Sequence, residues 1–317
     1  MFRYALHRLL LALPVVIGVS LVVFALMRLI PGDVVDRILG TEAGATPERR
    51  EELRRLFGID RPIHVQYLEW IGRALRGDLG SSLLNGRPVL GDLWLRLPAT
   101  LELASLSLLI ALLIGIPLGV WAAVRHHRWP DYLGSSFALL GVSIPNFWLG
   151  TMLILVFSLG LRWLPSAGYV PLVEDPVRSL QLMAMPAFAL GTAEAAAIMR
   201  SVRSATLEVL HHDHVRTARG KGLAERRVRT HHVLRNALIP VLTVVGLSAG
   251  YLLAGTFIIE QVFSIPGIGR FTLMGIMNRD YPVIQGAVLV IALSYLLVHL
   301  VVDVLYGVAD PRLRISD

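Results

Sequence analysis

The chain has no cysteine among its 317 residues, so a disulfide framework, a thiolate nucleophile and a cysteine-ligated zinc site are all excluded. Two further signatures are missing. There is no G-x-x-x-x-G-K-[ST] loop to cradle nucleotide phosphates and no H-E-x-x-H motif to bind a catalytic zinc ion. Charged residues supply only 17% of the composition and hydrophobic residues supply 55%, which is too apolar for an ordinary soluble surface. These features predict a membrane protein that does not itself hydrolyse ATP.

The apolar residues are gathered in runs near or above the roughly 18 residues that a membrane-spanning helix needs. Five runs carry no charge: 9–26, 103–124, 133–161, 237–259 and 283–298. A sixth, 180–199, is interrupted only by Glu194. Arg3 and Arg8 precede the first run, as in a signal peptide, but the run is too long and no small-residue cleavage pattern follows it. The sequence therefore predicts an all-α bundle of six transmembrane helices.

The net charge of +7 is unevenly divided between the two sides of this bundle. With both termini on one side, the short tails and loops of that side carry fifteen Lys and Arg residues, whereas the short loops opposite carry four. Short cytoplasmic loops are enriched in Lys and Arg. We therefore expect both termini to be cytoplasmic, and we interpret the basic excess as a sign of orientation rather than of nucleic-acid binding.

The spans divide the chain into three parts. Residues 1–30 form the N-terminal tail and first span, 31–98 form an extracytoplasmic segment, and 99–317 form the core with the other five spans. Within the outer segment, "ATPERREELRRLFG" and "DRPIHVQYLEWIGRALRG" each combine a proline near the start, apolar residues at helical spacing and a glycine stop. They predict two short amphipathic helices, either a solvated lid or a docking site for an extracytoplasmic partner.

Segment 260–282, between the last two spans, is half apolar but is broken by Pro266, Gly267 and Gly269. An apolar segment with a turn at a membrane edge is typical of a re-entrant or interfacial element. Such an element is tolerated only where protein or a water-filled cavity surrounds it, so the segment is a first indication of a pathway.

Polar residues at membrane depth are candidates for that pathway, because a charge in lipid costs several kcal/mol unless it faces a cavity or a partner. Glu194 and His299 lie deepest, although Glu194 could also extend to the interface. Glu260 lies nearer a span end, and Asn146 follows the helix-breaking Pro145. We predict pathway roles for Asn146, Glu194, Glu260 and His299.

Histidines cluster at 126–127, 211–214 and 231–232. Imidazoles bind zinc or nickel, but adjacent residues of one helix point in different directions and do not converge on one ion. We interpret all three clusters as exposed cytoplasmic residues, and predict neither a metal nor a cofactor bound by this chain.

Segment 208–240 is a basic, helix-prone cassette between two apolar spans. Its pattern predicts a helix leading to Ala218, a break at Gly220 and Gly222, and a second short helix from Leu223. One interpretation is a positively charged loop that touches lipid headgroups. The other is a docking element in which an exposed Leu223, beside the tight turn, inserts into a groove on a separate motor protein.

Several motifs together resemble those of the transmembrane permease subunits of bacterial ABC importers, in the branch that transports dipeptides, oligopeptides and nickel. The motifs are "PGDVVDRILG", "FGIDRPIHVQYLEWIGRALRGDLGSSLLNGRPV", "RLPATLELA", "GVSIPNFWLG", "VRTARGKGL", "LRNALIP", "GTFIIEQVFSIPGIGR", "NRDYPVIQG" and "VDVLYGVADPRLR". The resemblance covers nearly the whole chain. It implies a multi-pass protein of the bacterial inner membrane.

The same resemblance implies that the cassette is similar to the EAA loop, whose coupling helix seats in a cleft of an ATPase subunit. The residues that match this loop are Arg216, Thr217, Ala218, Arg219, Lys221, Gly222, Leu223 and Glu225. Arg216 and Thr217 replace the Glu and Ala of the general E-A-A-x-x-x-G pattern, while Ala218 and Gly222 are retained. The interval to Pro240 is longer than in the general pattern, and His299 stands where relatives often have Asn.

The resemblance implies the partners as well: a second homologous permease, two ATPase subunits that bind ATP and Mg, an extracytoplasmic binding protein and the lipid bilayer. The chain would form half of a pathway for di- or oligopeptides, without enzymatic activity of its own. The alternatives are a self-sufficient secondary transporter or channel, for which internal repeats and mid-membrane charges are few, and a membrane enzyme built on His299 and Asp303.

Overall fold

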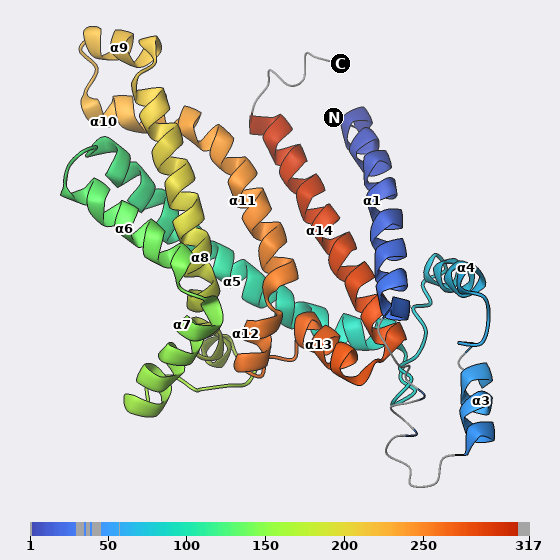
Figure 1. Ribbon diagram of the computed structural model, residues 1–317. Coiled ribbons are helices and arrows are strands. Elements are labelled where there is room, and N and C mark those ends of the chain that lie inside the picture. Colours follow the sequence, from blue (N-terminus) through green and yellow to red (C-terminus); the bar gives the residue numbers. More distant parts are fainter. Residues whose placement is uncertain (1, 30–34, 36–38, 40–45, 57, 310–317) are drawn as a thin grey trace.

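The computed structural model describes residues 2–29, 35, 39, 46–56 and 58–309, and in this part of the chain the protein is an assembly of helices (Figure 1). The helices are α1 (Phe2–Leu29), α3 (Pro47–Leu56), α4 (Ile63–Ala74), α5 (Val89–Val124), α6 (Trp129–Ser143), α7 (Asn146–Leu153), α8 (Pro176–Leu210), α9 (Asp213–Gly220), α10 (Glu225–Arg227), α11 (Arg235–Gly255), α12 (Phe257–Val262), α13 (Ile268–Asn278) and α14 (Tyr281–Ala309). Two π-helical segments, Ile154–Gly160 and Val228–Leu234, extend α7 and α10. The described residues contain no β-strand, only an isolated bridge between Ser81 and Pro88. The boundary at residues 30 and 31, and the basic residues Arg312 and Arg314, lie outside the described part.

Four helices are long and apolar enough to cross a membrane, and up to six spans result if each of two bent pairs counts as one. The first bent pair, Trp129–Ser143 with Asn146–Gly160, turns by 98°. This bend falls within the apolar run 133–161, at the proline that the sequence marks as helix-breaking. Pro145 disfavours the helical conformation of the residue before it, and Ile144 and Pro145 are both extended, with ψ angles of 121° and 133°. The second pair, Glu225–Leu238 with Pro240–Gly255, turns by 52° at another proline.

Helix α8 is the central element of the bundle. In its most apolar window 72% of the residues are buried, against 33% or less in the corresponding windows of α1, α5 and α14. Glycines let α5 approach it closely: a Cβ at Gly115 would lie 2.8 Å from the Ala195 carbonyl oxygen, and one at Gly119 would lie 2.7 Å from that of Met199. This small-residue spacing is typical of helix packing in membranes.

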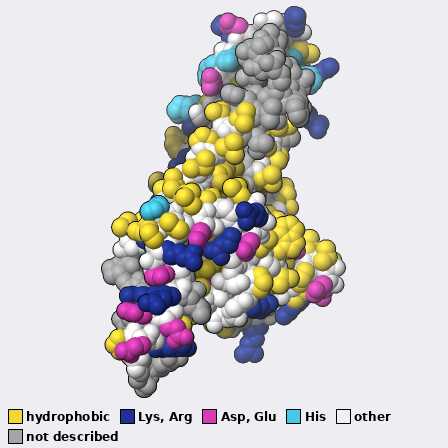
Figure 2. All heavy atoms as spheres, turned by 90° about the vertical axis from the view of Figure 1, so that its right-hand side faces the viewer, with side chains coloured by type: hydrophobic (Ala, Val, Ile, Leu, Met, Phe, Trp, Pro, Cys, Tyr) yellow, Lys and Arg dark blue, Asp and Glu magenta, His cyan; other side chains and the backbone are white. Residues whose placement is uncertain are grey.

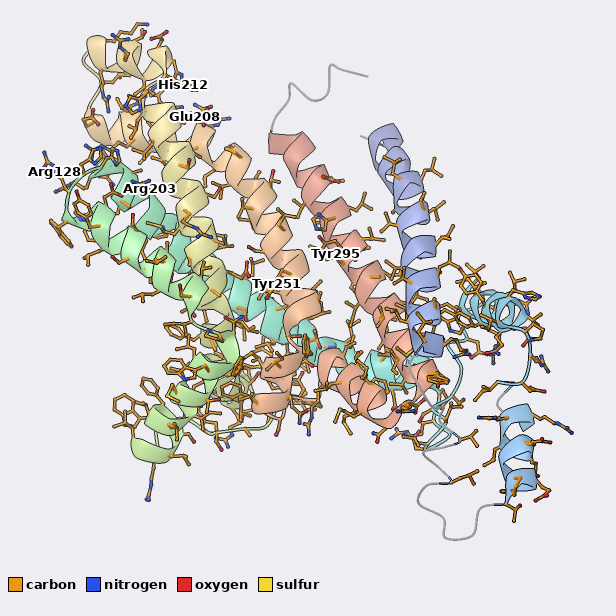
Figure 3. The ribbon with its side chains drawn as sticks, in the orientation of Figure 1. Arg128, Arg203, Glu208, His212, Tyr251 and Tyr295 are labelled. Atoms are coloured by element: carbon orange, nitrogen blue, oxygen red, sulfur yellow. The ribbon has the colours of Figure 1, made fainter. Side chains whose placement is uncertain are left out.

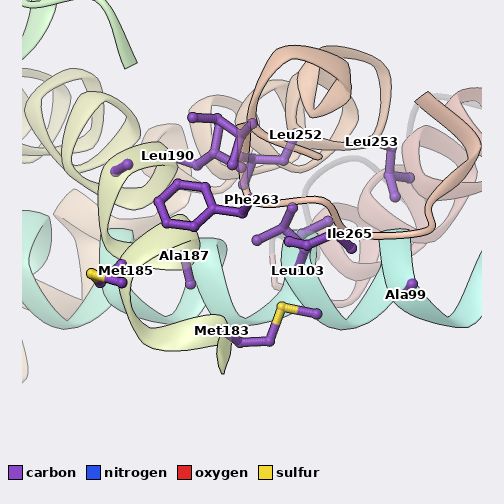
Figure 4. Packing of buried hydrophobic residues seen from close by; sticks show 13 residues of the cluster. Ala99, Leu103, Met183, Met185, Ala187, Leu190, Leu252, Leu253, Phe263 and Ile265 are labelled. Carbon is purple, nitrogen blue, oxygen red and sulfur yellow. The ribbon is translucent and has the colours of Figure 1, made fainter. Parts of the chain in front are cut away.

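The largest buried cluster joins α5, α8, α11 and the turn after α12 (Figure 4). Phe263, Ile265 and Leu103 are 1% exposed or less. Because lipid tails are as apolar as these side chains, the cluster is stabilised mainly by close van der Waals packing between the helices. The cluster ties the predicted re-entrant segment to the core.

The outer segment forms both short helices that its sequence predicts. Thr46 accepts a hydrogen bond from the Arg49 amide at the start of α3, and Pro62 precedes α4. Helix α4 packs on α1 through Trp70, whose ring stacks on Phe24. Figure 2 shows acidic and basic side chains intermingled at the lower end of the molecule, where the charged helix α3 lies.

Helices α9 and α10 lie at the opposite end of the molecule from α3, α4 and α13 (Figure 1). The first residues of α1 and the last residues of α14 lie at the same end as α9. The start of α1, the end of α14 and the cassette therefore lie at one end of the described part of the molecule.

Candidate functional site

Helix α9 is the centre of the cassette, and a left-handed glycine closes it. Gly222 has a φ of 75°, which L-residues rarely adopt. Its amide donates to the Arg219 carbonyl (2.9 Å), and the Leu223 amide donates to the Ala218 carbonyl (3.3 Å). These bonds occupy the last carbonyls of the helix, so the chain turns sharply towards α10.

The two faces of α9 differ in chemistry. Val215 and Ala218 are buried, at 0% and 5% exposure, and belong to a cluster with Val209, Val228 and Val233. The other face is polar and exposed: it carries Asp213, His214, Arg216, Thr217 and Arg219, and the exposed Lys221 and Gly222 follow directly after the helix. A rigidly anchored helix thus presents a basic surface beyond the end of α8.

Two details of the cassette correct the sequence analysis. Leu223 is not exposed: it is half-buried and packs against the valine cluster, since an apolar side chain beside that cluster gains by burial. The second helix begins at Glu225 rather than at Leu223. The Glu225 carboxylate accepts from Arg219 Nε (2.6 Å) and from Arg229 Nε (3.0 Å), which braces the turn from both sides.

An ion-pair network that the sequence analysis missed connects α8 to the α5–α6 loop. Arg203 donates from Nε and Nη2 to the two oxygens of the buried Asp131 carboxylate, at 2.6 and 3.0 Å. The His127 amide donates to Asp131 Oδ2 (3.0 Å), and His126 Nδ1 lies 2.8 Å from the same oxygen. Because such bidentate pairs fix geometry, the end of α8 that leads to α9 is held to α6 and to the α5–α6 loop. Asp131 directly after Pro130, at the start of an apolar run, was the available signal.

This network includes the one group of potential metal ligands found among the described residues: His126, His127 and Asp131, with ligand atoms within 4.8 Å of one another. Asp131 already binds the Arg203 guanidinium with both oxygens. A cation would have to displace that arginine, so the arrangement fits an ion-pair network better than a metal site.

Asn146 lines a cavity of about 410 Å³ with residues of α8, α11 and α12. It is the first residue of α7, so the bend at Pro145 is what brings its amide to the cavity. Leu190 and Tyr251 line the same space, and Tyr251 is 54% exposed (Figure 3). The cavity is mainly apolar with a few polar groups, as in small-molecule sites.

Glu194 lies on α8, where it is partly buried and interacts with Ser248 of α11. Residues 246–250, "GLSAG", match the G-x-S-x-G pattern of a hydrolase elbow. Ser248 nevertheless lies within a continuous helix and is only 4% exposed, whereas such an elbow needs a sharp turn between a strand and a helix. The serine therefore joins two helices and is not placed as a nucleophile.

Glu260 is fully buried rather than exposed to a cavity. Its Oε1 accepts from the hydroxyls of Thr100 and Thr256, both at 2.8 Å, and its Oε2 accepts from the Arg270 amide at 2.7 Å. The Thr100 oxygen in turn accepts from the Ile268 amide (2.9 Å). These hydrogen bonds connect the turn before α13 to α5. Glu260 is therefore placed as a structural residue, which gives no support to its predicted role in the pathway.

His299 is a residue of α14, and its side chain faces α11. Its ring is 4.4 Å from that of Tyr295 (centroid to centroid), and a Cβ on Gly250 would lie 3.2 Å from its Nε2. It also lines a groove of about 500 Å³ between α1 and α14, whose lining is otherwise mainly leucine and valine. The four predicted pathway residues are therefore dispersed: Asn146 and His299 line two different cavities, whereas Glu194 contacts Ser248 and Glu260 is buried.

Comparison with known proteins identifies the class. A family model for the inner membrane component of binding-protein-dependent transport systems matches residues 115–315, and a model for the N-terminal part of such components matches residues 1–104. The chain belongs to this family, and it is a permease subunit of an ABC importer.

The relatives are similar over almost their whole length. The chain is 42% identical to the dipeptide transport system permease protein of Escherichia coli K12, with 99% of each chain covered. It is 41% identical to a Brucella ovis protein named as a peptide permease, with 100% of each covered. The crystal structure of an amino acid ABC transporter with histidines has a TM-score of 0.49 at 17% identity, and covers 70% of this chain and 94% of that one.

Proposed function

We propose that this permease forms half of a translocation pathway for di- or oligopeptides, and that α9 couples it to ATP hydrolysis on a separate subunit. The observation that carries the coupling role is the construction of α9: a buried valine and alanine anchor it, and its basic face is exposed. A coupling element must move as a unit with what it drives. The peptide cargo is supported by the names of the relatives.

The proposed topology has six spans, with both termini and α9 in the cytoplasm of a bacterial cell and the protein in its inner membrane. It is supported by the common end that α1, α14 and α9 share, and by the excess of basic residues there. Helices α3 and α4 then face the opposite side, where a binding protein delivers cargo.

The proposed partners are a second homologous permease, two ATPase subunits and an extracytoplasmic binding protein. This chain has no phosphate-binding loop, so ATP and Mg are assigned to the ATPase subunits and no cofactor to this chain. Closure of the ATPases would displace α9. The Asp131–Arg203 network would carry that displacement from α8 into α5 and α6.

For the pathway, we assign Asn146 the best-supported role, because it lines the cavity beside the bend of the third span. Its amide both donates and accepts hydrogen bonds, which suits a peptide backbone. Asn146→Leu is expected to lower peptide uptake without loss of the assembled complex. Asn85→Leu, in the exposed outer loop, serves as the matched control.

The test of the function is purification of the tagged chain from its own membranes in mild detergent, followed by identification of bound proteins. Recovery of two P-loop ATPases and a second permease would support the proposal. Recovery of the chain alone, together with uptake by it in liposomes without ATP, would instead establish a secondary carrier.

A further inference from the structure

A groove of about 340 Å³ lies between α6 and α8, apart from the cavity at Asn146 and from the face of α9. Ala138, Leu139 and Met199 give it apolar walls, and Ser135, Arg200 and Arg203 give it a polar rim. Its size is within the range of small-molecule sites, about 300–1,000 Å³. The combination of an apolar slot and a cationic rim is amphipathic.

The two arginines of the rim differ in their partners. Arg203 is committed to both oxygens of Asp131. Arg200 is exposed and makes no hydrogen bond, ion pair or ring contact with any residue that the structure describes. A guanidinium always carries its charge and has five N–H donors. Arg200 therefore offers the groove an uncompensated positive charge.

The residues around the groove are of the types that mark the boundary between a membrane and water. Trp121 and Trp129 pair edge-to-face at 5.0 Å beside the α5–α6 loop, and both are exposed (40% and 61%). Arg128 and Arg203 lie at a similar level at this end of the bundle (Figure 3). Exposed tryptophans and arginines mark the interface of a membrane protein. Leu139 and Leu140, further along α6, are 69% and 57% exposed, as expected of a lipid-facing surface.

From these features we infer that the α6–α8 groove binds an anionic phospholipid of the cytoplasmic leaflet, an assignment that rests on the proposed membrane orientation. The phosphate is held by the Arg200 guanidinium and the Ser135 hydroxyl, and an acyl chain lies along Leu139. Basic pockets between spans on the cytoplasmic side suit acidic headgroups. The occupant is a lipid rather than free phosphate because the walls are apolar and the surface beside them faces the bilayer.

The test uses the full chain, within its complex, in nanodiscs of phosphatidylcholine with added phosphatidylglycerol. After purification in mild detergent, the retained lipids are counted by native mass spectrometry. Arg200→Gln is expected to lower the retention of phosphatidylglycerol about fivefold, the factor corresponding to about 1 kcal/mol for one arginine near an anionic surface. Arg200→Lys is expected to retain most of it, which controls for folding.

Two further variants distinguish lipid binding in the groove from non-specific attraction of anionic lipid to positive charge. Arg178→Gln removes an exposed arginine from the other end of α8 and is expected to change nothing. Ser135→Trp leaves the charge intact but fills the groove, so it is expected to reduce retention as Arg200→Gln does.

The inference would be overturned if Arg200→Gln retained as much phosphatidylglycerol as the wild type. It would also be overturned if the wild type retained phosphatidylcholine and phosphatidylglycerol equally well. Normal retention by Ser135→Trp would also overturn it, because the charge alone would then be sufficient.

Because the chain has no cysteine, Leu139→Cys supplies a unique crosslinking position. Crosslinking of that cysteine to the partner permease, rather than to a lipid probe, would show that protein covers the groove and would contradict the assignment. None of these outcomes depends on transport activity.

Discussion

Replacement of Gly267 by alanine tests how the turn before α13 is held. A Cβ at this position would overlap the Glu260 carboxyl group, although the φ of −89° suits any residue. The carboxyl group would have to move and give up one or more of its three hydrogen bonds, to Thr100, Thr256 and the Arg270 amide. Leaving a buried hydrogen-bond donor without its partner costs about 1–3 kcal/mol, and overpacking costs about 1–3 kcal/mol. We expect Gly267→Ala to lower the free energy of unfolding by about 2–6 kcal/mol.

The assay is SDS-induced unfolding in mixed micelles, with Gly72→Ala as the control. Gly72 lies in α4, and apart from its chain neighbours and its own helix backbone nothing lies within 4 Å of the position that an alanine methyl group would take, so alanine there is expected to be neutral or slightly stabilising. In a Glu260→Ala background the overlap is gone, and Gly267→Ala should then cost less than about 1 kcal/mol. Additive effects of the two substitutions, or tolerance of Gly267→Ala equal to that of Gly72→Ala, would refute the reasoning.

Three other predictions follow from the cytoplasmic end and the outer loop. Gly222→Trp should leave the chain inserted in the membrane, because the site is open within the chain and its φ of 75° costs an L-residue only about 1–2 kcal/mol. The same variant should abolish uptake while ATP hydrolysis continues, and normal uptake would contradict this. Asp131→Asn should lower the free energy of unfolding by about 2–3 kcal/mol, less than for a fully buried pair because the Arg203 side chain is 27% exposed; an unchanged SDS midpoint would count against the network. The pKa of Tyr169 is raised to about 12, mainly by burial and secondly by the nearby Glu102 carboxylate. The neutral phenol therefore stabilises the folded protein below about pH 10, and this contribution is lost as the pH rises towards 12. Tyr169→Phe should show a smaller loss over that window in pH-dependent unfolding, and identical curves would exclude the effect.

Local features of the fold were predictable because they depend on neighbouring residues. The prolines and glycines around α3 and α4 mark their limits, and the break at Gly222 lies where the sequence pattern places it. The angle of the bend at Pro145 was not predictable. A proline indicates a break, whereas the packing of α6 and α7 against α8 determines where the chain goes afterwards.

The parts of the candidate site that escaped prediction depend on residues far apart in the chain. Asp131 and Arg203 are separated by 72 positions, and Thr100 and Glu260 by 160. Contacts between residues so far apart leave no periodic pattern in the sequence. Leu223 illustrates the reverse error: beside a turn and among charged residues it was predicted to be exposed, but it packs against the valine cluster formed by α8, α9 and residues 228–234.

The most direct test of the coupling claim places a single cysteine on the exposed face of α9. Because the chain has no native cysteine, Thr217→Cys gives one defined crosslinking position, and Ser166→Cys in the loop before α8 is the control at the opposite end. In native membranes, we predict that Thr217→Cys forms a crosslink with a P-loop ATPase that changes in yield when ATP is added, whereas Ser166→Cys forms none. A complex that supports peptide uptake but shows no such crosslink from Thr217→Cys would contradict the account.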